Sequence, residues 1–110
     1  MYLPNANLAI VDREKIADYL LNPAHPDNGG KAKFFLGLGF TAEQWQVFAE
    51  ALQRLGGSFP VVRYEESPHG AKYIVIGQIE NPSGPSPSVR TVWIVDKGNE
   101  NPRLVTAYPG

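Results

Sequence analysis

The chain has 110 residues, a length that favours a single hydrophobic core. Hydrophobic residues make up 43% of the sequence and charged residues 19%, and this composition excludes an intrinsically disordered chain. Ten Lys and Arg residues against eleven Asp and Glu residues give a net charge of −1. That balance excludes a general duplex-DNA coat protein, which needs many cations to neutralise phosphates, but it allows an enzyme that engages a few phosphates in one cleft.

The sequence contains no cysteine, which excludes disulfides and thiolate metal sites. His25 and His69 are the only histidines, so we expect no metal site and no cofactor. No apolar run reaches the roughly 18–20 residues needed to span a bilayer. The first residues also lack the basic and apolar regions of a signal peptide. The sequence therefore predicts a cytoplasmic protein that makes no membrane contact.

The first half of the chain carries the signs of three helices. Residues 8–11 form an apolar run that predicts a short strand or an extended arm. Asp12 then offers an N-cap oxygen for a first helix, which should end before Pro23. A second, short helix is predicted over residues 31–36.

The third helix has the clearest pattern. Thr41 and Gln44 have the spacing of a capping box, and Phe40 can pack on Trp45 as a hydrophobic staple. Apolar residues then recur at helical spacing, and a Gly-Gly pair should end the helix at residues 56–57.

After residue 60 the hydrophobic period changes to two. Four strands are predicted over residues 61–66, 72–80, 89–96 and 103–108, and the short connections between them favour an antiparallel meander. The expected fold is α+β, with about three N-terminal helices packed on one face of a four-stranded antiparallel sheet. We expect one domain over residues 1–110, with a helical half (1–59) and a sheet half (60–110).

Residues 22–30 form the first candidate functional loop. His25 could act there as a general acid or base, or it could be an ordinary surface residue. Lys31 follows Gly30 at the expected start of the second helix, where an anion is favoured. Lys33 lies about 200° around that helix from Lys31, so the two cannot share one face. Lys31 is the better candidate, and Lys33 is kept as a substrate-binding candidate.

The sheet supplies a second set of candidates. Arg90 and Thr91 must face opposite sides of their strand, so helices that cover Thr91 and Trp93 would leave Arg90 on the open face. Thr106 is expected to share its face with Leu104 and Tyr108. An open face with these polar groups could grip RNA and stack its bases. The alternative is ordinary strand chemistry, because such residues favour sheets for packing reasons. The catalytic candidates on the sheet are Arg90, Thr106 and Tyr108, and the substrate-binding candidates are Thr91 and Trp93.

Several segments together resemble a bacterial family defined by a domain of unknown function, number 6883. They are LNPAHP at residues 21–26, KAKFFLGLGF at 31–40, RTVW at 90–93 and PRLVTAYP at 102–109. The resemblance covers nearly the whole chain in the same segment order, and it implies no particular activity.

The order of helices followed by a meander is also similar to that of the barnase, colicin and RelE-like ribonuclease toxins. In such small, metal-free nucleases an RNA 2′-hydroxyl attacks the adjacent phosphate. This resemblance implies catalytic roles for Lys31 or His25 from the helical side and for Arg90, Thr106 and Tyr108 from the sheet. RNA and a cognate antitoxin are the implied partners. One departure is the slightly acidic charge, because many such toxins are strongly basic.

Three functional hypotheses remain open from the sequence. The first is a metal-independent ribonuclease of toxin type. The second is a non-enzymatic module that docks a partner protein through the open sheet face or an edge strand. The third is an accessory subunit that buries Trp45, Tyr73 or Trp93 in an oligomer of undetermined size. Convergence of the five catalytic candidates in one concave pocket would favour the first hypothesis, and dispersed positions would favour the second.

Overall fold

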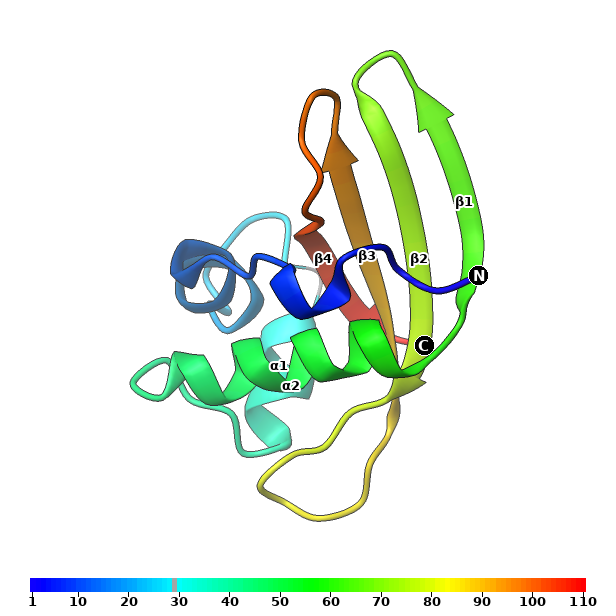
Figure 1. The fold of residues 1–110 in the computed structure, drawn as a ribbon. Helices are drawn as coiled ribbons and strands as arrows, with labels where there is room; N and C mark the ends of the chain where they lie inside the picture. Colours follow the sequence, from blue (N-terminus) through cyan, green and yellow to red (C-terminus); the bar gives the residue numbers. More distant parts are fainter. Residues whose placement is uncertain (29) are drawn as a thin grey trace.

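The computed structural model describes residues 1–28 and 30–110. In these described residues, four helical segments precede four strands (Figure 1). The segments are η1, a 3-10 turn (Ala6–Leu8), η2, a π-helix (Lys15–Leu20), α1 (Lys31–Gly37), α2 (Trp45–Ser58), β1 (Val61–Ser67), β2 (Gly70–Gln78), β3 (Ser88–Asp96) and β4 (Arg103–Pro109). No helix in the described part of the chain has the length and apolar character required to cross a membrane.

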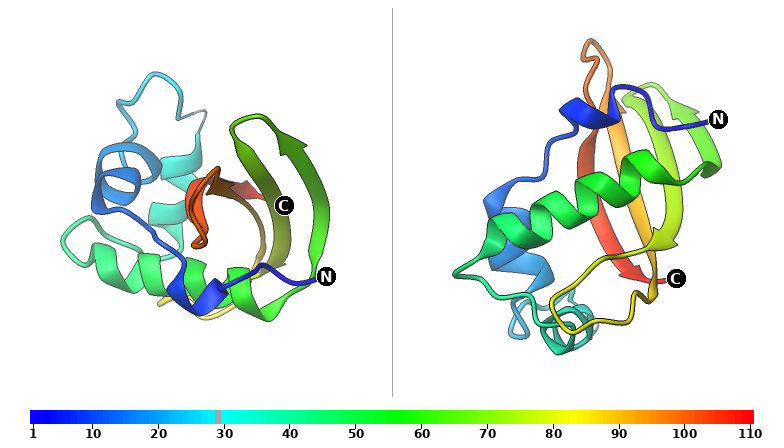
Figure 2. Two further views of the ribbon diagram at one scale, coloured as in Figure 1. Left: turned by 45° about the horizontal axis from the view of Figure 1, so that its top comes forward. Right: turned by 60° about the horizontal axis from the view of Figure 1, so that its bottom comes forward.

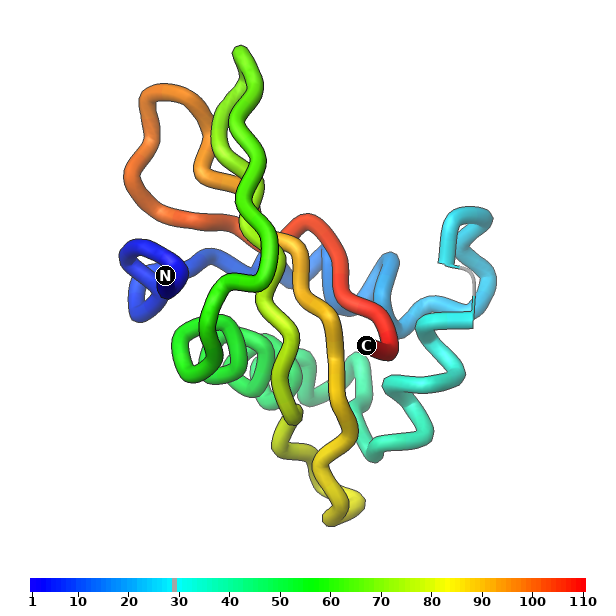
Figure 3. Tube along the Cα trace, turned by 90° about the vertical axis from the view of Figure 1, so that its right-hand side faces the viewer, coloured from blue at the N-terminus to red at the C-terminus, as the bar shows by residue number. Residues whose placement is uncertain are grey.

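The strands form one sheet in the order β1-β2-β3-β4, and each neighbouring pair is antiparallel. The predicted α+β meander is therefore confirmed, as are the three predicted helices, which correspond to η2, α1 and α2. The sheet curves, and α2 crosses its concave side diagonally (Figure 2). The tip of the β1–β2 hairpin extends beyond the helical layer (Figures 1 and 3).

The hydrophobic core lies between α2 and the covered face of the sheet. Trp93, Phe35 and Phe48 are completely buried there. The Phe48 ring lies 4.7 Å from that of Phe35 and stacks at 4.4 Å on that of Phe40. Because burying one such side chain contributes roughly 1.5–3 kcal/mol, this aromatic cluster holds α1 and α2 together over the sheet.

The predicted end of the third helix is wrong, because α2 continues through Gly56 and the next residue to Ser58. Gly56 faces the Trp93 ring so closely that a Cβ atom there would lie 2.7 Å from Trp93 Cζ2. This glycine therefore serves close packing of helix on sheet, and it does not terminate the helix. The start of the helix also differs from the prediction, because α2 begins at Trp45 and is not capped by Thr41. Thr41 Oγ1 accepts the Gln44 N–H at 3.2 Å in a turn that precedes the helix.

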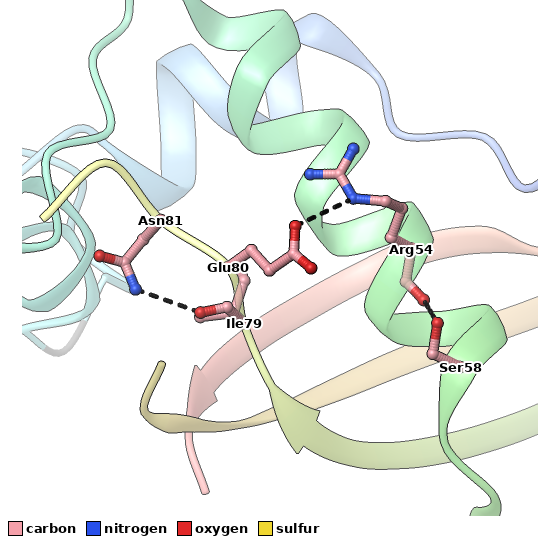
Figure 4. Close-up of polar contacts among 5 residues, drawn as sticks. All are labelled: Arg54, Ser58, Ile79, Glu80 and Asn81. Atoms are coloured by element: carbon pink, nitrogen blue, oxygen red, sulfur yellow. Dashed lines mark hydrogen bonds and ion pairs between the residues drawn. The ribbon is translucent and has the colours of Figure 1, made fainter. Parts of the chain in front are cut away.

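The C-terminal end of α2 is tied to the segment that follows β2 (Figure 4). Ser58 Oγ donates to the Arg54 carbonyl at 2.6 Å, and the Arg54 guanidinium pairs with Glu80 at 3.7 Å. Asn81 Nδ2 donates to the Ile79 carbonyl at 3.1 Å and so fixes the first bend of the β2–β3 loop.

The N-terminal arm runs from the start of β1, where the Met1 carbonyl accepts the Val61 N–H at 2.7 Å, to the edge strand β4 (Figure 1). The Ile10 N–H donates to the Pro102 carbonyl at 2.8 Å, and the Leu104 N–H donates to the Ile10 carbonyl at 2.9 Å. Ile10 thus forms an isolated parallel bridge with Arg103 of β4. The prediction of an extended arm near residues 8–11 is confirmed at this residue, although η1 takes up the chain as far as Leu8.

A register shift in β4 changes the side of the sheet on which Thr106 lies relative to Leu104. Val92 pairs with Thr106, but the next residue of β3, Trp93, pairs with Leu104, so Val105 is an extra residue in β4. Because of this bulge, Leu104 is buried on the core side while Thr106 lies on the open side with its pairing partner. The prediction that Thr106 shares its face with Leu104 is therefore wrong.

Thr91 and Trp93 belong to the covered face and are completely buried. Trp93 Nε1 donates to Thr91 Oγ1 at 2.8 Å, and Thr91 Oγ1 donates to the Val75 carbonyl at 2.8 Å. Tyr73 is also buried. The expectation of an exposed aromatic surface at Tyr73 and Trp93 is therefore wrong, because both side chains fill the core of this chain.

Candidate functional site

The candidate site lies where η2 and α1 meet the edge strand β4. Each of these three elements contacts the other two. Every segment contributes one polar side chain, namely Tyr19 from η2, Lys31 from α1 and Thr106 from β4. The rest of the site is arranged around these three groups.

Tyr19, Lys31 and Thr106 form a closed triangle of hydrogen bonds. Lys31 Nζ donates to the Tyr19 hydroxyl and, at 3.1 Å, to Thr106 Oγ1. The Tyr19 and Thr106 hydroxyl oxygens are themselves 3.2 Å apart. One ammonium group therefore bridges two hydroxyls that come from opposite halves of the chain.

Two more of the predicted residues extend this triangle across the open face of the sheet. Tyr108 pairs with Arg90 across β3 and β4. Its ring centroid lies 5.8 Å from Lys31 Nζ and 5.9 Å from the Arg90 guanidinium carbon. Both cations are within range of an attractive interaction with the ring, so Tyr108 connects Lys31 with Arg90.

His25 reaches the site from the first loop. Its ring meets the Tyr19 ring edge-on, with centroids 4.9 Å apart. The Asp27 N–H donates to His25 Nδ1 at 3.1 Å. A ring nitrogen that accepts a hydrogen bond carries no proton, and the neutral imidazole in this contact therefore carries its proton on Nε2.

Three of the predicted catalytic candidates, His25, Lys31 and Thr106, thus contact a residue that was not predicted, Tyr19. The other two, Tyr108 and Arg90, are linked to them through the contact of Tyr108 with Lys31. The three substrate-binding candidates lie elsewhere. Lys33 is an exposed residue of α1 and takes no part in the contacts described above. Thr91 and Trp93 are buried on the far side of the sheet, where no substrate could reach them without unfolding the core.

The surroundings of Tyr19 shift its acidity. Burial alone would raise the pKa of the Tyr19 hydroxyl, but the hydrogen bonds with Lys31 and Thr106 and the charges of Lys31 and Lys15 outweigh it. The pKa is lowered as a result. Lys15 Nζ lies 5.3 Å from the Tyr19 ring centroid and adds to this positive field. Tyr19 therefore ionises more readily than an ordinary tyrosine.

The site opens into a surface groove of ≈ 680 Å³. Tyr19, His25 and Thr106 reach it from the cluster, and Lys15 and Arg103 supply cations. Its remaining lining consists of Asp12, Glu14, Asp18, Asp27 and Val105. The groove is thus mixed in charge, and one of its two cations, Arg103, is paired with Asp96 at 2.6 Å.

Local backbone geometry places Tyr19 in the site. The Leu21 N–H donates to the Ile16 carbonyl at 2.9 Å, five residues back, as in a π-helix. The expected cap residue, Asp12, contributes its carbonyl to Ile16 at 3.3 Å. π-Helical turns are rare and often occur at functional sites. The wide turn leaves Ile16 and Leu20 fully buried while Tyr19 remains half-buried beside the groove.

Sequence reasoning missed Tyr19 and Lys15. Both lie in a segment whose clearest sequence feature is its apolar stripe. Their spacing of four residues would place them on one side of an ordinary helix, and this spacing could have indicated that the two side chains lie close together. Among the described residues, no group of three or more His, Asp or Glu side chains is arranged to hold a metal ion.

Comparisons with known proteins place this geometry in a wider context. No curated protein matches the chain. A chain of a solved structure titled "Contact-dependent growth inhibition toxin - immunity protein complex from Klebsiella pneumoniae 342" has a similar fold, with a TM-score of 0.72 at 20% identity. The match covers 92% of the present chain and 99% of the other. A family model described as "Domain of unknown function (DUF6883)" matches residues 2–110, and the chain therefore belongs to this family.

Proposed function

We propose that this chain is a toxin-type module that cleaves RNA without a metal ion, at the site around Tyr19. The observation that carries the proposal is the contact of His25, Lys31 and Thr106 with that tyrosine. Tyr108 extends the cluster, because its ring lies 5.8 Å from Lys31 Nζ and 5.9 Å from the Arg90 guanidinium carbon. These residues come from a loop, a helix and two strands, and His25, Thr106 and Tyr19 also line the groove, so cations and hydroxyls lie where a substrate phosphate could bind.

Cations free to bind phosphate are the first requirement of such a site. None of the ion pairs found in the described part of the chain involves Lys15, Lys31 or Arg90. Lys31 is bound by two hydroxyl oxygens instead. Its charge therefore remains available to the scissile phosphate, while Arg90 and Lys15 are placed to hold flanking phosphates.

The proposed reaction is transfer of the phosphorus from the 5′-oxygen to the neighbouring 2′-oxygen. The ionised Tyr19 oxygen takes the proton of the RNA 2′-hydroxyl, and the 2′-oxygen forms a bond to phosphorus. The bond from phosphorus to the 5′-oxygen then breaks, and the leaving oxygen receives a proton from the Lys31 ammonium. The products are a 2′,3′-cyclic phosphate and a 5′-hydroxyl. A proton passing from Tyr19 to Lys31 restores the starting state.

The remaining residues stabilise and orient the reactants. His25 presents its Nε2–H as a hydrogen-bond donor to a phosphate oxygen, because its Nδ1 is already engaged by the Asp27 N–H. Thr106 orients the Lys31 ammonium. Tyr108, held between two cations, offers a ring on which a base can stack. These groups act where negative charge develops on the phosphate.

The biological setting is the second part of the proposal. The similar fold occurs in a complex whose title names a growth inhibition toxin and an immunity protein. By analogy of fold, we propose that this chain acts against cells and is neutralised by a cognate protein that binds it.

The test is cleavage of a labelled RNA by the purified protein in the presence of a chelator. We expect 2′,3′-cyclic phosphate ends, and we expect the Lys31→Ala, Arg90→Ala double variant to lose activity by at least about 100- to 1,000-fold. The matched control is Lys33→Ala, which removes an exposed cation from the same helix and should remain fully active. Absence of cleavage by the unaltered protein, or equal cleavage by the double variant, would refute the proposal.

A second candidate function is favoured by the exposed edge of β1. Val62 and Tyr64 are 55% and 39% exposed on this edge strand, and the outer side of an edge strand can accept another strand. The chain would then be a non-enzymatic binding module. Expression in a host cell separates the two candidates, since a binding module should leave growth unaffected whether or not Lys31 and Arg90 are intact.

A further inference from the structure

Asn28 is a buried polar residue between the two helical segments that build the site. Its side chain is only 3% exposed, while most of the loop around it lies at the surface. A buried amide must have hydrogen-bond partners to avoid a large desolvation cost. The partners of Asn28 therefore reveal what it holds in place.

Both ends of the Asn28 amide are engaged. Nδ2 donates to the Tyr19 carbonyl at 2.6 Å, and Oδ1 accepts the Ala32 N–H at 2.8 Å. One bond fixes the end of η2, and the other satisfies a free N–H in the first turn of α1. The amide thus fixes the distance between the backbone of Tyr19 and that of Ala32, the residue that follows Lys31.

The backbone of Asn28 adds two more bonds to the same group of residues. Its N–H donates to the His25 carbonyl at 3.1 Å, and its carbonyl accepts the Lys31 N–H at 3.1 Å. Asn28 is therefore bonded directly to His25, Tyr19, Lys31 and Ala32. Three of these four residues contribute side chains to the candidate site.

We propose that Asn28 is a positioning residue that holds Tyr19 and Lys31 in contact and so assembles the site. The catalytic consequence rests on the proposed ribonuclease function, whereas the structural consequence does not. Asn28 reaches the site through Tyr19 and Lys31, and it is assigned no direct contact with a substrate. A shift of about 1 Å between the two groups would suffice to disable the reaction.

Asn22 provides a matched control. It uses the same chemistry, since its Nδ2 donates to the Asp18 carbonyl at 3.2 Å and its Oδ1 accepts the Ala24 N–H at 3.0 Å. These bonds also join η2 to the following loop, but they hold neither Tyr19 nor Lys31. Asn22→Ala therefore removes an equivalent amide bridge without loosening the site.

The first measurement is the ionisation of Tyr19, followed by phenolate absorbance and isolated by subtracting the same protein carrying Tyr19→Phe. In Asn28→Ala the pKa of Tyr19 should rise toward its ordinary value of about 10, because the Lys31 ammonium is no longer held against it. Asn22→Ala should leave it unchanged. The charged and titratable groups around the hydroxyl are the same in all these proteins, namely Lys15, His25, Lys31 and Arg103 with the carboxylates Asp12, Glu14, Asp18 and Asp27.

The second measurement is RNA cleavage. With Asn28→Ala we expect kcat to fall by up to about 100-fold while KM changes little, because the phosphate-binding cations remain. An Asn28→Ala protein that folds and keeps the Tyr19 pKa of the unaltered protein would overturn the proposal. If the unaltered protein cleaves no RNA, the ribonuclease proposal fails while the titration still decides the role of Asn28.

A third measurement applies if Asn28→Ala does not fold. In the unaltered protein the side-chain amide protons of Asn28 should exchange slowly with solvent, and their NMR signals should move as Tyr19 titrates. Rapid exchange, or signals indifferent to that titration, would overturn the proposal.

Discussion

Tyr19 and Tyr64 lie toward opposite edges of the sheet and bond to groups of opposite charge. Beside β4, the Tyr19 hydroxyl accepts a hydrogen bond from the Lys31 ammonium, and its pKa is lowered even though burial opposes this. On β1, the Tyr64 hydroxyl donates to the Glu66 carboxylate, which raises the pKa of Tyr64 to about 12. Ionisation of the same side chain is thus favoured at one edge and opposed at the other.

The origin of the two environments also differs. The partner of Tyr64 lies two residues away on the same strand, so the strand alone creates that contact. The partners of Tyr19 lie 12 and 87 positions away, at Lys31 and Thr106. The β4 edge therefore depends on tertiary structure, whereas the β1 edge depends on local sequence. The following predictions test this difference.

The largest expected effect comes from Lys31→Met, which keeps the apolar stem of the side chain and removes its charge. RNA cleavage should fall by about 100- to 1,000-fold. The pKa of Tyr19 should rise above its present value, because burial then acts with less opposition. The control is Lys72→Met on β2, which removes a cation paired with Glu65 at 3.3 Å near the other edge and should alter neither quantity. If Lys31→Met kept its activity, Lys31 would have no role in RNA cleavage.

The next effect concerns the core that both edges share. Gly56→Ala introduces a Cβ atom against the Trp93 ring, and we expect the free energy of unfolding to fall by about 1–3 kcal/mol. Gly37→Ala is the control, because nothing lies within 4 Å of its Cβ position. Its stability should stay level or rise by up to about 1 kcal/mol. Chemical denaturation measures both, and equal stabilities would contradict the packing role of Gly56.

The third effect is an opposite pH dependence of stability at the two edges. The folded pKa of Tyr19 lies below its unfolded value, so its contribution to stability should grow as pH rises from the folded pKa to about 10. The folded pKa of Tyr64 lies above its unfolded value, so its contribution should be lost as pH rises from about 10 to about 12. Denaturation of Tyr19→Phe and Tyr64→Phe against the unaltered protein should show slopes of opposite sign. Slopes of the same sign would contradict the opposite pKa shifts of Tyr19 and Tyr64.

The smallest effect is expected from Glu66→Gln. This change should lower the pKa of Tyr64 toward its ordinary value, because the carboxylate that raises it is gone. RNA cleavage and the Tyr19 titration should be unchanged. A response of Tyr19 to Glu66→Gln would mean that the two edges are coupled through the sheet.

The sequence predicted most of the fold because its periodicity is strong. The change of period after residue 60 located all four strands, and the apolar stripe located α2. Among the features that the sequence did not predict, two depend on contacts between distant residues. The extra residue Val105 carries no signature in a strand of alternating residues, since a bulge is decided by pairing with β3. Gly56 resembles a helix terminator unless the Trp93 ring above it is known.

The candidate site was predicted in part for similar reasons. His25 and Lys31 stood out because they lie in a loop rich in proline and glycine, and Arg90, Thr106 and Tyr108 because they are polar or aromatic residues of strands. Tyr19 did not stand out, since an aromatic residue in a helix is usually a packing residue. Its role depends on a π-helical turn that only the folded chain defines.

The bond between Tyr19 and Thr106 joins two residues separated by 87 positions. During synthesis, the helical segments leave the ribosome long before β4 does. η2 and α1 have six and seven residues and pack against β4, and helices this short are marginal on their own. A partly made chain therefore lacks both the support for these segments and the Thr106 hydroxyl that completes the triangle. A complete site therefore exists only after β4 has been synthesised and has paired with β3.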